Sequence, residues 1–169
     1  MSERRVLVVD DSAFMRRVLR DLIDAMPGFT TCAAVRDADE AMHAVRTLDP
    51  DLVTLDVELP GTDGLSVLAW LMAEAPRPVV MVSGAASADG MTTVLRALEL
   101  GAVEFVRKPS GPISLDLATV ADALERALQA AAASRVAPAR RVGADANVAV
   151  RAPSTAALAV LVIAASTGG

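Results

Sequence analysis

Hydrophobic and polar positions along the chain form five repeated pairs, each a short apolar run followed by a longer amphipathic segment. The short runs have the length and composition of buried strands, and the segments after them have the apolar spacing of helices with one buried face. Regular alternation of this kind predicts an α/β fold, with a doubly wound parallel sheet between two layers of helices. The predicted strands are 6–9, 29–35, 52–56, 78–83 and 103–106.

The ends of the predicted helices are marked by capping and turn residues. Asp63 is placed to cap a helix that begins near Gly64, and Gly101 is a natural end for the fourth helix. The first helix ends before Pro27-Gly28, and the last begins near Ser114. The first is expected to bury one face, made of Phe14, Met15, Val18, Leu19, Leu22, Ile23 and Met26, and the last to bury Leu117, Ala121, Leu124 and Leu128.

Two strand orders suit five such units, the flavodoxin-like order 2-1-3-4-5 and a Rossmann half. The first strand is not followed by the glycine-rich phosphate loop of a Rossmann fold, so we predict the order 2-1-3-4-5. In that order the first and third strands are neighbours. Asp10, Asp11 and Asp56, which follow or end these strands, should then converge at the edge of the sheet where ligands bind.

Composition and charge narrow the possible functions. The formal net charge of −5 gives no electrostatic footprint for nucleic acid. Cys32 is the single cysteine, and the apolar run near the N-terminus is too short for a signal peptide. The apolar stretch near the C-terminal end is too short for a membrane span. These features predict a soluble cytoplasmic protein with no nucleic-acid partner and no membrane insertion.

The predicted site has the groups needed for phosphoryl transfer. Three converging carboxylates repel one another, and a hard cation such as Mg²⁺ removes that cost. Ser83 ends the fourth strand with a hydroxyl, and Lys108 follows the fifth. Of the 16 basic residues 15 are Arg, so the one lysine suggests a position that requires a compact ammonium group. A carboxylate nucleophile, a metal and cationic and hydroxyl groups together suit phosphoryl chemistry.

These motifs resemble the receiver domain of two-component response regulators over about residues 4–130. The matching features are the Asp pair at 10–11, Asp56 with Pro60-Gly61 after it, Ser83, and Lys108-Pro109. The resemblance implies that a histidine kinase phosphorylates Asp56. It also implies that Asp10, Asp11, Asp56 and the backbone carbonyl of Glu58 hold Mg²⁺, that Ser83 and Lys108 contact the phosphoryl oxygens, that Phe105 is a conformational-switch aromatic, and that a cis peptide joins Lys108 to Pro109.

A narrower resemblance is to the chemotaxis protein-glutamate methylesterases, through LDVELPGTDGL, LRALELGAVEFVRKPSG and VIAASTGG. It implies a receiver domain over 1–133, a flexible linker over 134–156 and the truncated start of an esterase domain over 157–169. Ser166 would be the esterase nucleophile, although Ala164 replaces the usual Gly. The implied partners are a chemotaxis-type histidine kinase and, through the esterase domain, methylated chemoreceptors. An apolar regulatory surface is expected around Leu95–Phe105.

Three alternatives concern the output of the chain. The first is that the chain is itself the esterase. A serine hydrolase needs a base and an orienting acid, but no histidine follows Ser166 and His43 lies in the predicted receiver. We therefore expect this chain to be inactive as an esterase. A stand-alone receiver with no esterase output is a second possibility. An aspartate-nucleophile phosphatase is a third, because Asp56-Val57-Glu58 has the D-x-D spacing, but those enzymes have the nucleophile before the acidic pair.

Overall fold

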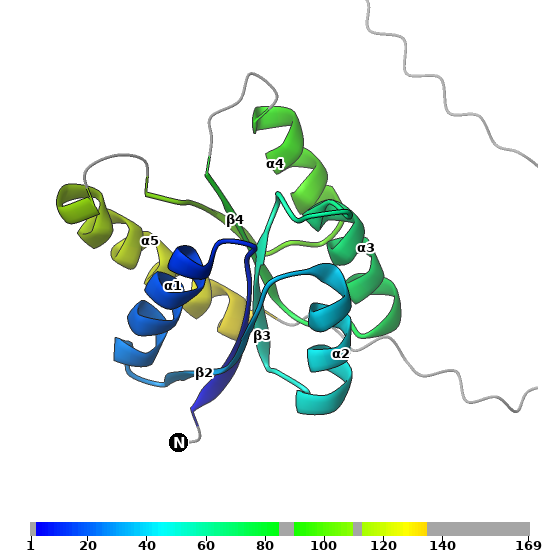
Figure 1. Ribbon diagram of the computed structural model, residues 1–169, viewed down its shortest axis with the longest axis horizontal. Coiled ribbons are helices and arrows are strands. Elements are labelled where there is room, and N and C mark those ends of the chain that lie inside the picture. The colour runs from blue at the N-terminus through cyan, green and yellow to red at the C-terminus, as the bar shows by residue number, and fades with distance from the viewer. Residues whose placement is uncertain (1–2, 85–89, 110–112, 135–169) are drawn as a thin grey trace, which may run out of the picture.

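The structure, a computed structural model, describes residues 3–84, 90–109 and 113–134. Strands and helices alternate along this part of the chain (Figure 1). None of its helices has the length and apolar character needed to cross a bilayer. The elements are β1 (Arg4–Val9), α1 (Ala13–Ala25), β2 (Phe29–Val35), α2 (Ala38–Leu48), β3 (Leu52–Asp56), α3 (Gly64–Glu74), β4 (Val79–Ser83), α4 (Gly90–Glu99), β5 (Glu104–Arg107) and α5 (Ile113–Ala133).

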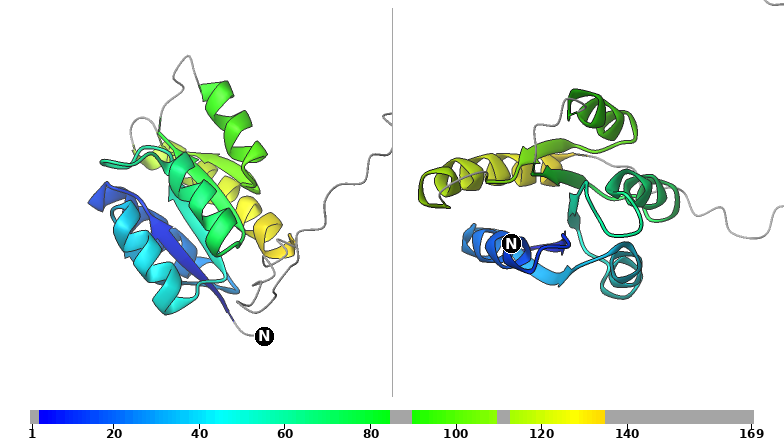
Figure 2. Two further views of the ribbon diagram at one scale, coloured as in Figure 1. Left: turned by 90° about the vertical axis from the view of Figure 1, so that its right-hand side faces the viewer. Right: turned by 45° about the horizontal axis from the view of Figure 1, so that its top comes forward.

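The strands form one parallel sheet in the order β2-β1-β3-β4-β5, which confirms the predicted topology. Helices α1 and α5 lie on one face, and α2, α3 and α4 lie on the other (Figure 2). Crossover connections between parallel strands place helices on both faces of such a sheet. The carboxyl ends of all five strands therefore point toward the same edge.

The central strands are buried on both faces, which explains their continuous apolar sequences. In β3, Val53 and Leu55 pack into the core beneath α2 and α3, whereas Leu52 packs into the core beneath α1 and α5. β1 alternates in the same way, with Leu7 toward the first core and Val8 toward the second. This two-sided burial fixes β1 and β3 at the centre of the sheet.

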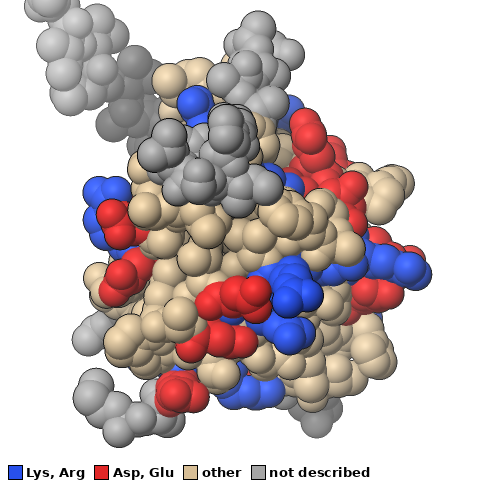
Figure 3. Space-filling view, turned by 60° about the vertical axis from the view of Figure 1, so that its left-hand side comes forward, with Lys and Arg blue, Asp and Glu red and all other residues tan. Residues whose placement is uncertain are grey.

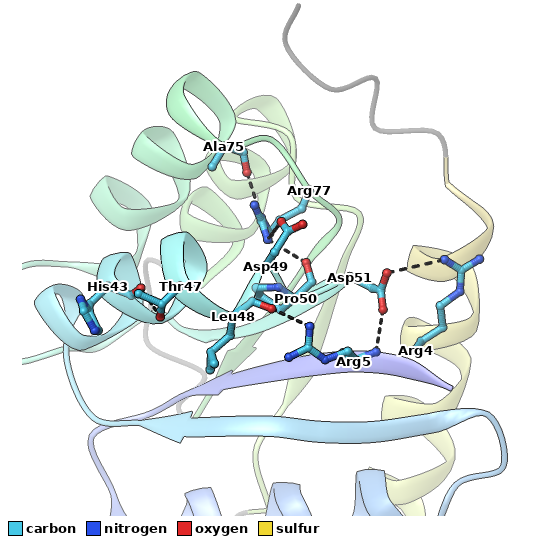
Figure 4. A network of polar contacts seen from close by, with 10 residues as sticks. All are labelled: Arg4, Arg5, His43, Thr47, Leu48, Asp49, Pro50, Asp51, Ala75 and Arg77. Atoms are coloured by element: carbon cyan, nitrogen blue, oxygen red, sulfur yellow. Dashed lines mark hydrogen bonds and ion pairs between the residues drawn. The ribbon is translucent and has the colours of Figure 1, made fainter. Parts of the chain in front are cut away.

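A polar network closes the opposite edge of the sheet, where the strands begin (Figure 4). The backbone N–H of Arg5 donates to Asp51 Oδ2 at 2.8 Å, and its guanidinium donates to the carbonyl of Leu48 at 2.6 Å. Arg77, before β4, donates to the carbonyl of Pro50 at 2.7 Å. These bonds join β1, the α2–β3 loop and the segment that enters β4, so they hold the three strand starts together.

The first helix differs from its predicted face at one position. Met15, Leu19 and Ile23 are buried, at a spacing that places them in one line along α1. Phe14 precedes that line and is 53% exposed, so the prediction that it is buried was wrong. It lies about 100° around the helix from Met15, which is enough to point away from the sheet.

Helix α4 exposes most of its apolar side chains. Ala97 is its buried residue, whereas Met91, Leu95 and Leu98 are 73%, 54% and 43% exposed. Leu100, just after the helix, is 36% exposed. We refer to Met91, Leu95, Leu98 and Leu100 as the α4 apolar surface, which overlaps the region expected to be regulatory. On the face formed by α1 and α5, by contrast, basic and acidic side chains are interspersed (Figure 3).

The cap of α3 provides a test of local stability. Asp63 Oδ1 accepts the backbone N–H of Ser66 at 2.7 Å at the start of the helix. Asp63→Ala leaves that donor without its partner and should lower the free energy of unfolding by about 1 kcal/mol. Asp63→Asn keeps an acceptor oxygen and should remain within a few tenths of a kcal/mol of the wild type. Urea denaturation measures both variants, and equal losses would contradict a capping role.

Candidate functional site

The predicted site residues from four strands meet at the carboxyl edge of the sheet. Asp10 follows β1, Asp56 ends β3, Ser83 ends β4 and Lys108 follows β5. The strand register aligns Asp56 with Val82 on β4, one residue before Ser83. The backbone N–H of Lys108 donates to the carbonyl of Ser83 at 2.7 Å. The sheet order thus brings together residues that are far apart in the sequence.

Lys108 pairs with two carboxylates at once. Its Nζ lies 2.6 Å from Asp56 Oδ2 and 2.7 Å from Asp10 Oδ2. The side chains of Asp10 and Asp56 are 0% and 1% exposed, and that of Lys108 is 12% exposed. Three charged groups are therefore held out of water in one cluster. Burial of this kind requires mutual pairing, because an isolated buried charge is strongly unfavourable.

The cluster shifts the ionisation of both partners. Burial raises the pKa of Asp56, although hydrogen bonds from Lys108 and from the backbone N–H of Glu58 oppose the effect. Burial acts to lower the pKa of Lys108, but its hydrogen bonds to Asp10 and Asp56 outweigh burial and the pKa is raised. The lysine is therefore held as an ammonium ion beside a carboxylate that ionises less readily than usual.

Asp10, Asp11 and Asp56 offer an oxygen-rich site for a divalent cation. One carboxylate oxygen from each of them lies within 4.8 Å of the others. Two of these residues are buried and Asp11 is exposed, so the cluster is open to solvent on one side. Carboxylate oxygens with room for water ligands are what Mg²⁺ requires. The donor set therefore fits the expected cofactor.

The turn after β1 is held by hydrogen bonds of its own side chains. Asp10 Oδ1 accepts the backbone N–H of Ser12 at 2.9 Å, and Ser12 Oγ accepts that of Met15 at 3.3 Å as the cap of α1. Across the site, Asp56 Oδ1 accepts the backbone N–H of Glu58 at 3.1 Å. Each buried carboxylate thus has one oxygen committed to its own loop and the other paired with Lys108.

The loop after β3 approaches the backbone of Asp56 very closely. The N–H of Gly64 donates to the carbonyl of Val57 at 2.8 Å, which folds the start of α3 back onto the end of β3. A Cβ at position 64 would lie 2.0 Å from the carbonyl oxygen of Asp56. Only glycine fits here without moving the backbone. The sequence reading placed Gly64 at a helix start and missed this contact, which has no signature in periodicity or capping.

The remaining predicted site residues have mixed outcomes. Phe105 is half-buried on β5 and packs against the core beneath α2 and α3. The peptide bond between Lys108 and Pro109 is trans, so the expected cis peptide was wrong. The trans form is the intrinsically favoured one even before proline. Ser166, most of the predicted linker and the segment 157–169 lie outside the described residues.

Comparisons with known proteins agree with this fold. Residues 6–121 match the family model of the response regulator receiver domain. The response regulator domain of Thermotoga maritima CheB has a solved structure that matches 78% of this chain and 98% of its own, with 42% identity and a TM-score of 0.69. The chain therefore belongs to the response regulator receiver family. Within that family, it carries the receiver domain of a CheB-type chemotaxis response regulator.

Two curated relatives are named protein-glutamate methylesterase/protein-glutamine glutaminase. The protein from Symbiobacterium thermophilum is 49% identical over 130 residues, which are 77% of this chain and 36% of the relative. That from Halalkalibacterium halodurans is 40% identical over 168 residues, which are 99% of this chain and 48% of the relative. The chain thus spans less than half the length of these two relatives.

Substitution of Gly64 tests the close approach to Asp56. Gly64→Ala must displace the backbone of Asp56 or of α3, and we expect a loss of about 2 kcal/mol or more in the free energy of unfolding. Gly90→Ala is the matched control, because nothing lies within 4 Å of a Cβ at that helical position. The control should be neutral or slightly stabilising. Similar urea midpoints for Gly64→Ala and the wild type would disprove the clash.

The raised pKa of Asp56 predicts a stability that depends on pH. The carboxyl group of Asp56 has a lower pKa in the unfolded chain than in the folded protein. Ionisation of Asp56 therefore lowers the free energy of unfolding as the pH rises through the folded-state pKa. In chelator-treated protein, Asp56→Asn should therefore raise the free energy of unfolding at pH 7.

The gain should shrink at a pH below the usual range of carboxyl groups, where the wild-type residue is protonated in both states. Thermal melts at the two pH values measure the difference. Asp21→Asn, an exposed change on α1, serves as the control. A variant less stable than the wild type at pH 7 would show that the pairing with Lys108 outweighs the cost of burial.

Proposed function

We propose that this chain is a phosphorylation-dependent switch in which Asp56 accepts a phosphoryl group from a histidine kinase. The observation that carries the proposal is the position of Asp56, buried at a strand end and bonded to Lys108 within a carboxylate cluster. A carboxylate oxygen of Asp56 attacks the phosphorus of a phosphohistidine. The P–N bond breaks, an acyl phosphate forms, and the leaving imidazole takes up a proton.

Residues around Asp56 support this reaction through charge and position. The ammonium of Lys108 is already beside the attacking carboxylate and offsets the negative charge that the phosphoryl group brings. The hydroxyl of Ser83, at the end of the next strand, is assigned to a phosphoryl oxygen. We propose that Phe105, on β5, changes position when the site is phosphorylated. Ser83 ends β4 and Phe105 lies on β5, and both strands reach the edge of the sheet that carries the site. Neither assignment therefore requires a change in the sheet.

The carboxylates of Asp10, Asp11 and Asp56 would hold Mg²⁺, with the backbone carbonyl of Glu58 as a further ligand. When bound, the ion supplies positive charge to the phosphoryl oxygens and to the surrounding carboxylates. Lys108 must then share the two buried carboxylates with the ion. Its long side chain can turn toward a phosphoryl group without a change in the backbone.

The relatives suggest the output of the switch. We propose that the receiver controls a protein-glutamate methylesterase and glutaminase domain, as in the curated relatives, and that residues 134–156 are the linker and 157–169 the start of that domain. Ser166 would be its nucleophile. The kinase would be of the chemotaxis type, and the substrates would be methylated chemoreceptors. Because no histidine follows Ser166, we expect no ester hydrolysis from these 169 residues alone.

The α4 apolar surface is the proposed contact region for that domain. Its leucines and methionine are exposed in the described part of the chain, and such side chains gain stability when a partner covers them. Phosphorylation at Asp56 would then change how strongly this surface holds its partner.

Phosphoryl incorporation tests the assignment of Asp56. With acetyl phosphate and Mg²⁺, the wild type should gain one phosphoryl group, detected as a mass increase in intact-protein spectrometry. Asp56→Asn should gain none, because the amide is not a nucleophile at this site. Asp21→Asn, which removes an exposed carboxylate on α1, should label like the wild type. Labelling of Asp56→Asn at the wild-type level would place the phosphoacceptor elsewhere.

A further inference from the structure

Arg16 makes an unusual contact with the turn that carries two of the site carboxylates. Its Nη1 donates to the backbone carbonyl oxygens of both Asp10 and Asp11, at 2.9 Å each. The residue lies in the second turn of α1 and is half-buried. One guanidinium nitrogen thus joins two consecutive peptide groups between β1 and α1, across the capping residue Ser12.

The two carboxylates of this turn differ in how they are held. The side chain of Asp10 is buried, bonded to the N–H of Ser12 and paired with Lys108. The side chain of Asp11 is exposed and takes part in no hydrogen bond or ion pair with the described residues. Its direction therefore depends on its own backbone. Among the described residues, Arg16 is the side chain that bonds to the carbonyl of Asp11.

We propose that Arg16 is a positioning residue for the divalent cation: its guanidinium fixes the main chain of Asp10 and Asp11 so that both carboxylates remain within reach of the ion. The inference rests on the proposed function, because it assigns a cation to this cluster. Groups that orient metal ligands from behind in this way typically contribute about 10- to 100-fold to metal affinity.

The charge of Arg16 supports the same role. A guanidinium carries a positive charge, and its hydrogen bonds to neutral acceptors are stronger than those of a neutral donor. It also adds positive charge next to three clustered carboxylates without occupying a coordination position. The turn can therefore hold its acidic groups together before the ion arrives, which reduces the reorganisation needed on binding.

Arg17 provides a matched control on the same helix. Its side chain is 84% exposed, and its Nε lies 3.7 Å from Asp21 Oδ2. Removal of such a surface ion pair has little effect on stability. Arg16→Ala and Arg17→Ala therefore remove the same chemical group at adjacent positions, and only the first touches the turn. Ile23→Val, in the buried face of α1, controls for a loss of stability without a change in the turn.

Metal affinity of the whole chain tests the inference. Titration with Mn²⁺, followed by electron paramagnetic resonance of the free ion and by competition with Mg²⁺, gives the dissociation constants. Arg16→Ala should weaken binding about tenfold. Arg16→Lys, which keeps the charge with a different donor geometry, should recover part of the loss. Arg17→Ala and Ile23→Val should bind within about twofold of the wild type.

The outcomes separate this inference from the function on which it rests. Wild-type affinity in Arg16→Ala would overturn the positioning role and leave the metal site intact. Equal weakening by Ile23→Val would also overturn it, because general loss of stability would then explain the effect. A wild type that binds neither ion would overturn the metal site and the inference together. If Arg16→Ala does not fold, Arg16→Gln takes its place, with the same expected loss and the same controls.

Discussion

The buried contact among Lys108, Asp10 and Asp56 is the constraint on which the rest of the structure depends. These charges come from the ends of three different strands, so they can meet only in a parallel sheet with β1 and β3 adjacent and β5 within reach. Two carboxylates and one ammonium leave a net negative cluster out of water. Such an arrangement is weak as a source of stability, since desolvation offsets most of the attraction. Under the proposed function its value lies in chemistry, because it keeps the proposed nucleophile, an ammonium group and the proposed metal ligands at fixed distances.

The backbone segments around this cluster are held in place by close contacts, as its side chains are. Gly64 allows α3 to begin against the carbonyl of Asp56, and Ser12 and Arg16 hold the turn behind Asp10. The loop after β1 covers only residues 10–12, and the longer loop after β3, residues 57–63, is closed by the hydrogen bond from Gly64 to Val57. Both features limit the freedom of the backbone at the site. Under the proposed function, a cation or a phosphoryl group would therefore meet groups that are already oriented, and little binding energy would be lost in ordering them.

Much of this arrangement could be predicted from the sequence because its signals are local. Apolar runs that end in Asp, Ser or Lys mark strands and place their last residues at one edge, and the absence of a glycine-rich loop favours the order 2-1-3-4-5. Side-chain contacts across the turns were not predictable in this way. The bond from Arg16 to two carbonyls and the lack of space at Gly64 depend on loop conformation, and neither changes the pattern of apolar positions.

Two expectations from the sequence were wrong, for different physical reasons. Phe14 is apolar, and periodicity alone cannot tell whether an apolar residue at the margin of a helical stripe faces the sheet or the solvent. The sequence also could not distinguish the two peptide isomers before Pro109, because their free energies differ by only about 0.5–1 kcal/mol.

The single buried residue of α4 has a consequence for how the domain moves. Helices α1, α2 and α3 each bury three or more side chains, whereas α4 is attached through Ala97. Local opening is least costly where few apolar contacts are lost, so this helix should exchange its amide hydrogens faster than the other three. A small change at the end of β4 or β5 can then shift the helix without unfolding the core. The domain thus combines a closely packed charged cluster with one loosely held helix. Under the proposed function, phosphorylation of the cluster would change how often α4 occupies each of its positions.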